Sequence, residues 1–381
     1  MEFLSGFGLW GGGWTGWIIP FLFVLSVVVF FHELGHFLVA RWCGVRVLVF
    51  SIGFGPEIVG FNDRHGTRWK IAAIPLGGYV RFFGDENAAS VPDQAAIAAM
   101  TAAEARESFF HKSVSRRAAI VAAGPIANFI LAIVIFATVA MTFGKQIISA
   151  RVDTVRPASA ALAAGFRAGD LVVSIDGRAI ESFTDMQRIV SGSAERTLEI
   201  VVDRGGAPVT LKAVPKLQEV KDRFNNTHRI GVLGIERSTA PGDVRTERVS
   251  PGQAIVEGVE QTWFVIERTM SYLAGVIVGR ESADQLGGPA RIAQVAGQMA
   301  SLGILPIINL AAVLSVSIGL LNLFPIPLLD GGHLLFYAVE AIRGRPLSDR
   351  AQEVGFRIGL AIVLMLMIFA TFNDILRLTS S

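Results

Sequence analysis

Long apolar segments alternate along the chain with segments in which polar and apolar positions are mixed. Four stretches contain almost no charged side chain, at residues 16–40, 118–143, 302–329 and 354–372. A helix needs about 20 residues, at roughly 1.5 Å rise each, to cross the hydrocarbon core of a bilayer. The pattern therefore predicts a polytopic α-helical membrane protein with four transmembrane helices.

The segment between the first two spans has features of β-structure. Residues 45–50 are mostly β-branched or apolar, residues 51–56 contain two glycines and a proline, and residues 69–83 form a second strand-like run. We expect a small membrane-associated β-hairpin loop here. The alanine-rich residues 88–106 fit either a short surface helix or a mobile connector.

Residues 147–217 change character. Short β-rich runs at 198–202 and 209–213 alternate with turn signals, as in a small β-rich domain. Residues 164–170 and 175–177 resemble the PDZ domains of bacterial envelope proteases. The resemblance implies one inserted PDZ-like domain.

Residues 229–235 are similar to the PDZ loop whose backbone amides hold a peptide carboxylate. By this similarity, the candidate substrate-binding residues are Gly231, Val232, Leu233 and Gly234. The alternative is that these glycines only close hairpins.

Residues 253–278 are apolar but are interrupted by Glu257, Glu260, Glu267 and Arg268. We interpret them as an amphipathic helix on the outer leaflet and not as a fifth span.

Charge in the loops predicts the orientation. Residues 41–117 contain 10 Lys/Arg against 7 Asp/Glu, and the last loop carries Arg343, Arg345 and Arg350. Loops rich in Lys and Arg stay in the cytoplasm. Alternation of the spans then places residues 145–300 and both termini outside.

Composition narrows the candidate chemistry. Hydrophobic residues make up 52% of the chain and charged residues 17%, and the net charge of +2 is spread without a basic block, so nucleic acid is not an expected partner. Cys43 is the single cysteine, which excludes an intrachain disulfide and a thiolate zinc cluster. A metal ion would have to be bound by His, Asp or Glu.

The first span contains the sequence His32-Glu33-Leu34-Gly35-His36. On a helix, the two histidines are one turn apart, about 40° in azimuth, so both imidazoles can reach one ion. Glu33 projects beside them and can act on a bound water, as in the HExxH metalloprotease motif. The alternative is a pair of histidines whose hydrogen bonds are satisfied by neighbouring helices.

A catalytic zinc usually takes three protein ligands. The best third candidate is Asp330, which ends the third apolar stretch after Pro325 and Pro327 and before two glycines. The prolines should break the helix and the glycines should let the chain turn sharply. His333 is a competing ligand.

HExxH in the first span, together with Asn-x-x-Pro-x-Pro-x-x-Asp-Gly at residues 322–331, resembles the site-2 protease family of intramembrane metalloproteases. Nearly the whole chain is similar to its bacterial RseP-type branch. Matching pieces lie at residues 53–56, 74–79, 123–128 and 287–289. One apparent PDZ domain stands where the best-known enterobacterial members carry two.

The resemblance implies one zinc ion bound by His32, His36 and Asp330, with Glu33 as general base and Asn322 holding the substrate backbone or the oxyanion. It also implies that a helical substrate unwinds and adds as a strand to an edge of the hairpin, at residues 45–50 or 69–80. The alternative for Asn322 is an amide that satisfies interhelical backbone.

The implied function is regulated intramembrane proteolysis of single-span membrane proteins, such as an anti-sigma factor, after a first extracytoplasmic cut. Alternatives are the clearance of signal-peptide remnants by the same chemistry, and a non-enzymatic PDZ-bearing scaffold or metal transporter. The expected location is the bacterial inner membrane, with membrane-protein substrates and lipid as partners.

The expected domain boundaries follow from these assignments. They are a first span at 1–41, the hairpin loop at 42–117, a second span at 118–144, the PDZ-like domain at 145–240, an amphipathic segment at 241–301, a third span at 302–333, and a cytoplasmic loop with the fourth span at 334–381.

Overall fold

The structure is a computed structural model that describes residues 15–85, 97, 99–221, 227–237, 243–279, 283 and 287–380. The chain divides into two compact units. The first, here the helical unit, comprises Met1–Ala137, Ile255–Ser271 and Leu286–Ser381; the second, the β-rich unit, comprises Thr138–Ala254 and Tyr272–Gln285.

The predicted spans are present in the part of the chain that the structure describes. Four helices there are long and apolar enough to cross a membrane, over Gly16–Trp42, Val114–Phe143, Ile304–Asn322 and Arg350–Leu376. The elements outside the β-rich insertion are α1 (Thr15–Trp42), β1 (Val47–Asn62), β2 (Arg68–Phe82), α3 (Ala102–Glu107), α4 (Val114–Phe143), α7 (Pro251–Ile277), α8 (Pro289–Ser301), α9 (Ile304–Asn322), α10 (Asp330–Arg343) and α11 (Asp349–Ser380). α3 falls in the segment for which the sequence left a helix or a connector open.

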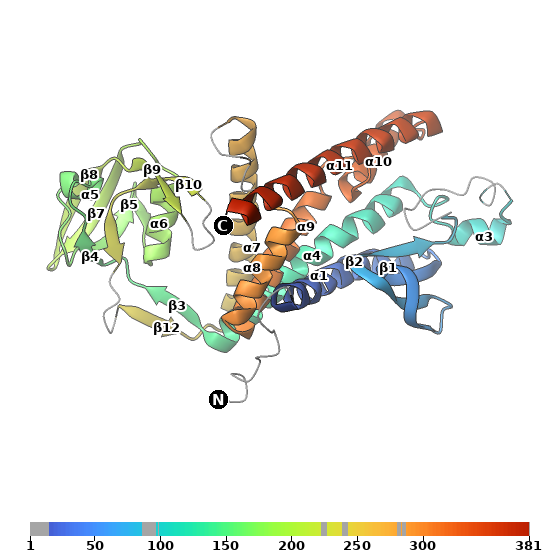
Figure 1. The fold of residues 1–381 in the computed structure, drawn as a ribbon, viewed down its shortest axis with the longest axis horizontal. Helices are drawn as coiled ribbons and strands as arrows, with labels where there is room; N and C mark the ends of the chain where they lie inside the picture. The colour runs from blue at the N-terminus through green and yellow to red at the C-terminus, as the bar shows by residue number, and fades with distance from the viewer. Residues whose placement is uncertain are drawn as a thin grey trace. The chain divides into compact units, whose positions relative to one another are not determined.

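Helices α1 and α4 run side by side (Figure 1). Gly35 of α1 lies directly on the backbone of Ala123, and an added Cβ there would be 2.7 Å from the Cβ atom of Ala127. Small residues let membrane helices approach closely, because packing and not water drives their association. On another side of α1, Val24 and Val28 pack with Ile307 and Ala311 of α9. The central helix α1 is thereby held between α4 and α9.

Within the third apolar stretch, at residues 302–329, the helix stops before the two prolines. α9 ends at Asn322, a tight turn follows, and α10 begins at Asp330. Pro325 and Pro327 lack the backbone N–H that a continued helix needs. Gly331 and Gly332 pack directly on backbone carbonyls of residues 323–326, where a Cβ would not fit. The predicted helix break and sharp turn are thus confirmed, and α10 occupies part of the segment expected to be a loop.

The hairpin between α1 and α4 is more folded than its two strands suggest. Both strands bend near their glycines, and Gly53 and Gly55 have φ values of +90° and +84°. Residues 49–52 pair with residues 68–71 on one side and with residues 78–81 on the other, while residues 57–62 pair with residues 68–72. The order across the sheet is therefore 57–62, 68–72, 49–52 and 78–82.

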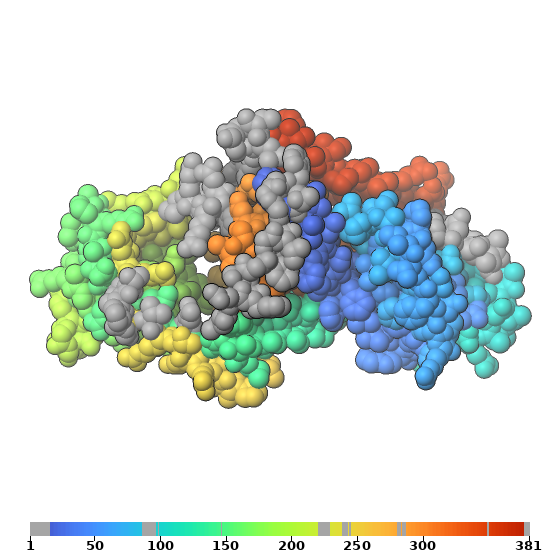
Figure 2. Space-filling model, turned by 60° about the horizontal axis from the view of Figure 1, so that its bottom comes forward, coloured from blue at the N-terminus to red at the C-terminus, as the bar shows by residue number. Residues whose placement is uncertain are grey.

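One face of the hairpin packs on α1 and the other is open. Phe50 and Trp69 stack 4.2 Å apart and contact Phe37 of α1. Figure 2 shows the hairpin, in blue, at the surface of the helical unit, where Ile58 and Phe61 are 69% and 62% exposed. Such large exposed apolar side chains are typical of a surface that meets lipid or a partner.

Helix α7 confirms the predicted helix at residues 253–278 and begins with a capping box at Ser250. Its side chains Val265 and Ile266 pack against a buried cluster of α4 and α9. Gly258 lies close to the backbone of Ile133: a Cβ added at Gly258 would be 2.6 Å from the Ile133 carbonyl oxygen. α7 therefore packs directly on α4; its position on the outer leaflet stays a prediction.

The β-rich unit has a sheet of order β6-β5-β7-β8 around a core that includes Ile175, Leu198 and Ile200. Its elements are β3 (Lys145–Ile148), β4 (Val152–Val155), α5 (Ala160–Ala164), β5 (Leu171–Ile175), β6 (Arg178–Ala179), α6 (Phe183–Ser191), β7 (Leu198–Arg204), β8 (Ala207–Ala213), β9 (Lys216–Lys221), β10 (Thr227–Val232), β11 (Ile235–Arg237) and β12 (Val244–Glu247). β7 and β8 are the two runs that the sequence predicted as strands.

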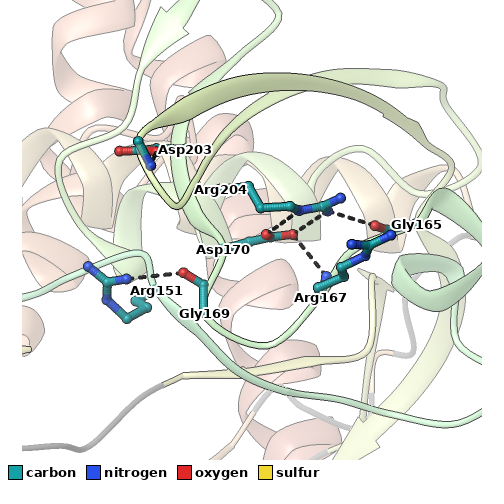
Figure 3. Close-up of polar contacts among 8 residues, drawn as sticks. Arg151, Gly165, Arg167, Gly169, Asp170, Asp203 and Arg204 are labelled. Atoms are coloured by element: carbon teal, nitrogen blue, oxygen red, sulfur yellow. Dashed lines mark hydrogen bonds and ion pairs between the residues drawn. The ribbon is translucent and has the colours of Figure 1, made fainter.

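A buried ion pair ties this sheet to the glycine-rich turn before β5. Arg204 donates to both carboxylate oxygens of Asp170, each at 2.8 Å, and to the carbonyl of Gly165 (Figure 3). The backbone N–H of Arg167 donates to the same carboxylate at 2.9 Å. These hydrogen bonds from Arg204 hold the pKa of Asp170 below its ordinary value.

Candidate active site

Helix α1 presents three chemically active side chains near its C-terminal end. His32 and His36 lie one turn apart, and their Nε2 atoms are 3.3 Å from each other. The rings meet edge to face with centroids 4.8 Å apart. Both Nε2 atoms thus point at a common position.

Asp330, the first residue of α10, completes this group. Its Oδ2 atom lies 3.2 Å from His32 Nε2 and 3.6 Å from His36 Nε2. The three side chains are only 11%, 12% and 17% exposed, so bulk water does not separate them. The turn after α9 therefore brings Asp330 next to two histidines that lie about 300 positions earlier in the chain.

The donor set fits zinc. Tetrahedral zinc with ligands at roughly 2.0–2.1 Å places its donor atoms about 3.3 Å apart, close to the separations of the three atoms here. Asp330 Oδ2 is also buried, and it faces both imidazole Nε2 atoms. A buried carboxylate oxygen that converges with two imidazole nitrogens is the kind of donor set that holds a cation.

The ring of His36 is held in the orientation that a metal ligand needs. Its Nδ1 lies 2.9 Å from the backbone carbonyl of Ile120 on α4, so Nδ1–H donates and Nε2 keeps its lone pair. Gly124, one turn further along α4, lies against both imidazoles: a Cβ there would overlap His36 Nε2 and be 2.9 Å from His32 Cε1.

Glu33 is not one of the three converging residues, and it faces the hairpin. A Cβ on Gly78 of β2 would be 3.0 Å from Glu33 Cγ. The backbone of Val80 hydrogen bonds to the Glu33 carboxylate. The carboxylate is therefore placed between the histidines of α1 and the edge strand 78–82 of the hairpin.

His333 and Asn322 are the two other candidate residues on α9 and α10. His333 sits one turn after Asp330, but its ring packs against Phe356 of α11, with centroids 5.4 Å apart. It does not belong to the group of converging donor atoms found among the described residues. Asn322 is the last residue of α9 and is half-buried before the turn that leads to Asp330.

The residues of the candidate carboxylate loop lie in the β-rich unit. Gly231 and Val232 belong to β10 and pair with β9. Leu233 is buried, and its carbonyl accepts a hydrogen bond from the backbone N–H of Ala161 at 2.8 Å. Gly234 has a φ of +83° and packs on Ser159, so a side chain at 234 would strain the fold as well as cover the loop.

Three contributors to the site were missed from the sequence: the Ile120 carbonyl, Gly124 and Asn128. Residues 123–128 were recognised only as part of a family motif. A usable signal existed for Asn128, because it is the one amide side chain in an otherwise apolar span, and polar groups in spans are rarely without a function. The structure places its Nδ2 3.3 Å from His32 Nδ1.

Comparison with known proteins found a family model that matches most of the chain. The model of peptidase family M50 matches residues 20–366. An Agrobacterium fabrum protein named "Putative zinc metalloprotease" is 53% identical over 361 residues, which cover 95% of this chain and 96% of that protein. Metalloprotease MmpA of Caulobacter vibrioides is 44% identical, with coverage of 94% and 95%.

Among solved structures, the PDZ domain of an SdrC-like protein from Listeria monocytogenes is similar to part of the chain. The identity is 22%, the TM-score is 0.19, and the match covers 24% of this chain and 87% of that domain.

The family match extends over most of the chain, the relatives match at nearly full length, and the described residues include four helices able to span a membrane. The chain therefore belongs to peptidase family M50, the site-2 protease family, and is a multi-pass zinc metalloprotease.

Proposed function

We propose that the protein cuts other membrane proteins at the level of the bilayer, with His32, His36 and Asp330 as zinc ligands and Glu33 as general base. The observation that carries this proposal is the triangle of three donor atoms, 3.2 to 3.6 Å apart, with Glu33 beside it on a helix long enough to span the membrane. A zinc ion held there supplies a Lewis acid that acidifies water and polarises the scissile carbonyl.

In this proposal the residues of the chain move one proton. The Glu33 carboxylate takes the proton from the attacking water and delivers it to the nitrogen of the leaving amine. The backbone of Val80 hydrogen bonds to this carboxylate and helps to hold it beside the histidines. Asn322, at the end of α9, binds the substrate backbone or the oxyanion through its amide.

The substrate adds as a strand to residues 78–82. Residues 49–52 are already paired on both sides, as are residues 69–71, so neither can accept another strand. The edges of the sheet are residues 57–62 and 78–82, and the latter adjoin Glu33 through Gly78. An unwound substrate segment bound at this edge would expose its amides to the catalytic carboxylate.

The substrates are single-span proteins already trimmed outside the membrane, in regulated intramembrane proteolysis of the RseP type. An anti-sigma factor-like regulator is the proposed example. In this topology the hairpin is cytoplasmic, and the β-rich unit and both termini lie outside a bacterial inner membrane. Reporters inserted at Gly66, in the β1–β2 turn, and at Gly206, in the β7–β8 turn, should read cytoplasmic and extracytoplasmic; the opposite readings would reject it.

The β-rich unit, which we propose to be PDZ-like, filters substrates mainly by excluding bulky ectodomains. A clean deletion is possible because β3 pairs with β12, and the backbone N–H of Ser149 donates to the Asp243 carbonyl at 2.8 Å. Replacing residues 152–237 by a short linker should permit cleavage of untrimmed substrate. A stable, active deletion protein that still refuses untrimmed substrate would reject exclusion and favour carboxylate capture.

The proposed chemistry is tested with Glu33→Gln in detergent or proteoliposomes, using a single-span substrate with a short ectodomain. The variant should keep the zinc content of the wild type and lose roughly a hundredfold to ten-thousandfold in cleavage rate. Glu260→Gln, on the exposed side of α7, is the matched control and should cleave normally. Normal cleavage by Glu33→Gln would remove Glu33 from its role.

A further inference from the structure

Asn128 is a fully buried polar residue on α4 that the proposed mechanism does not use. It is 0% exposed. Its main-chain carbonyl accepts a hydrogen bond from Ser315 Oγ of α9 at 2.8 Å. Gly319 of the same helix packs against Asn128: a Cβ added at Gly319 would be 3.1 Å from the Asn128 Cβ atom. The position of the residue is thereby fixed, which leaves rotation of the side-chain amide as its main freedom.

The amide is directed at a candidate zinc ligand. Asn128 Nδ2 lies 3.3 Å from Nδ1 of His32, whereas Asn128 Oδ1 is buried without a hydrogen-bond partner. A buried amide oxygen without a partner is destabilising, because the group has lost its hydrogen bonds to water. A half-turn about the Cβ–Cγ bond exchanges the two amide atoms and brings Oδ1 to His32 Nδ1.

The two amide orientations match the two tautomers of a neutral imidazole. When His32 carries its proton on Nε2, Nδ1 accepts a hydrogen bond and needs the NH₂ group of Asn128. When Nε2 gives its lone pair to a metal ion, Nδ1 carries the proton and needs the oxygen. His36 has no such choice, because a backbone carbonyl, that of Ile120, already faces its Nδ1.

We propose that Asn128 is a positioning residue that holds His32 in both tautomers and turns its amide over when His32 binds zinc. His36 is then set permanently for metal binding, while His32 is set by the amide. The inference rests on the proposed ligand set, and it assigns to α4 a role in metal affinity that is separate from the hydrolytic step.

The test measures zinc affinity of the full-length protein in detergent, by competition with a chelator, and the visible spectrum of the cobalt-substituted protein. Asn128→Leu, of similar volume without hydrogen-bonding atoms, should weaken zinc binding roughly tenfold to a hundredfold. Asn128→Asp, which can accept from Nδ1–H, should retain wild-type affinity and the wild-type cobalt spectrum. Ser315→Ala removes the neighbouring hydrogen bond but not the amide, and should also bind as wild type.

Wild-type affinity in a folded Asn128→Leu protein would overturn the inference, as would a loss in Asn128→Asp equal to that in Asn128→Leu. If Asn128→Leu does not fold, Asn128→Ala, which adds no bulk, is measured in its place against the same two outcomes. His32→Ala separates this inference from the proposed function: unchanged zinc binding in that variant would reject the ligand set itself.

Discussion

The backbone of Gly124 on α4 lies directly against the imidazole of His36 on α1. A Cβ at 124 would overlap Nε2 of His36 and would also lie 2.9 Å from Cε1 of His32, closer than van der Waals contact. The two rings can converge only because residue 124 has no side chain. The same helix also provides the Ile120 carbonyl to His36 and the Asn128 amide to His32.

Gly124→Ala should lower zinc affinity roughly tenfold or more, because the new methyl group forces an imidazole out of its position and overpacking of this kind costs about 1–3 kcal/mol. The measurement is zinc competition on the purified protein. Gly252→Ala is the matched control, since nothing lies within 4 Å of a Cβ there. Equal affinities in the two variants would show that the rings are not confined by α4.

Gly359→Ala should destabilise the turn that carries Asp330. Gly359 of α11 packs directly on the carbonyl of Pro327, and no room exists for a methyl group between the two backbones. Gly355 lies one turn earlier, and a Cβ added there would meet only the Phe336 ring, at 2.8 Å. That ring can rotate away. We expect a larger loss of zinc affinity and thermal stability in Gly359→Ala than in Gly355→Ala; the reverse order would contradict this account of the turn.

The ion pair between Arg117 and Glu340 should show a coupling energy of about 0.5–3 kcal/mol. The pair joins the start of α4 to α10 at 2.6 Å, its side chains are 13% and 14% exposed, and the Arg117 guanidinium also lies over the Tyr337 ring. Arg117→Glu and Glu340→Arg should each lower the thermal stability, and the double exchange should restore much of it. Additive losses in the double variant would show that the contact contributes nothing.

The stability of the β-rich unit should depend on pH through Asp170. Arg204 lowers the pKa of this carboxyl below its ordinary value of 3.8, so its contribution is fully present above that value and is lost as the pH falls through the lower folded pKa. Asp170→Asn should cost about 1–3 kcal/mol at pH 7 and should abolish this acid-dependent loss. Hydrogen exchange of β5, corrected for the intrinsic rate, checks both effects. Parallel pH curves for the two proteins would contradict the assignment.

Strand addition at residues 78–82 predicts a position-specific cross-link. Tyr79 and Lys70 both pair with Ser51, but residue 79 lies on an edge strand and residue 70 on a central one. In a Cys43→Ser background, cysteine at 79 should form a disulfide with a cysteine near the scissile bond of a bound substrate, whereas cysteine at 70 should not. The Glu33→Gln variant would be used to keep the substrate intact. Equal cross-linking at both positions would exclude this edge as the binding strand.

Much of the site was predictable because its signals are local. The apolar length of each span, the one-turn spacing of His32 and His36, and the helix-breaking prolines before Asp330 depend only on neighbouring residues. These features also carried the correct family assignment. The C-terminal limit of α9 could not be predicted to the residue, because apolar residues continue past Asn322 and only the folded turn shows where the helix stops.

What the tertiary structure alone decided are the contacts between residues far apart in the chain. Both hairpin strands fold back on themselves, and this folding decides which segments lie at the edges of the sheet. Residues 49–52 become central, although their sequence is as strand-like as that of an edge segment. Asn128 and Gly124 acquire their roles only because α4 packs on α1 at the height of the histidines. Sequence periodicity determines which face of a helix is apolar, but the depth and rotation at which two apolar helices meet are set by the packing of many side chains at once.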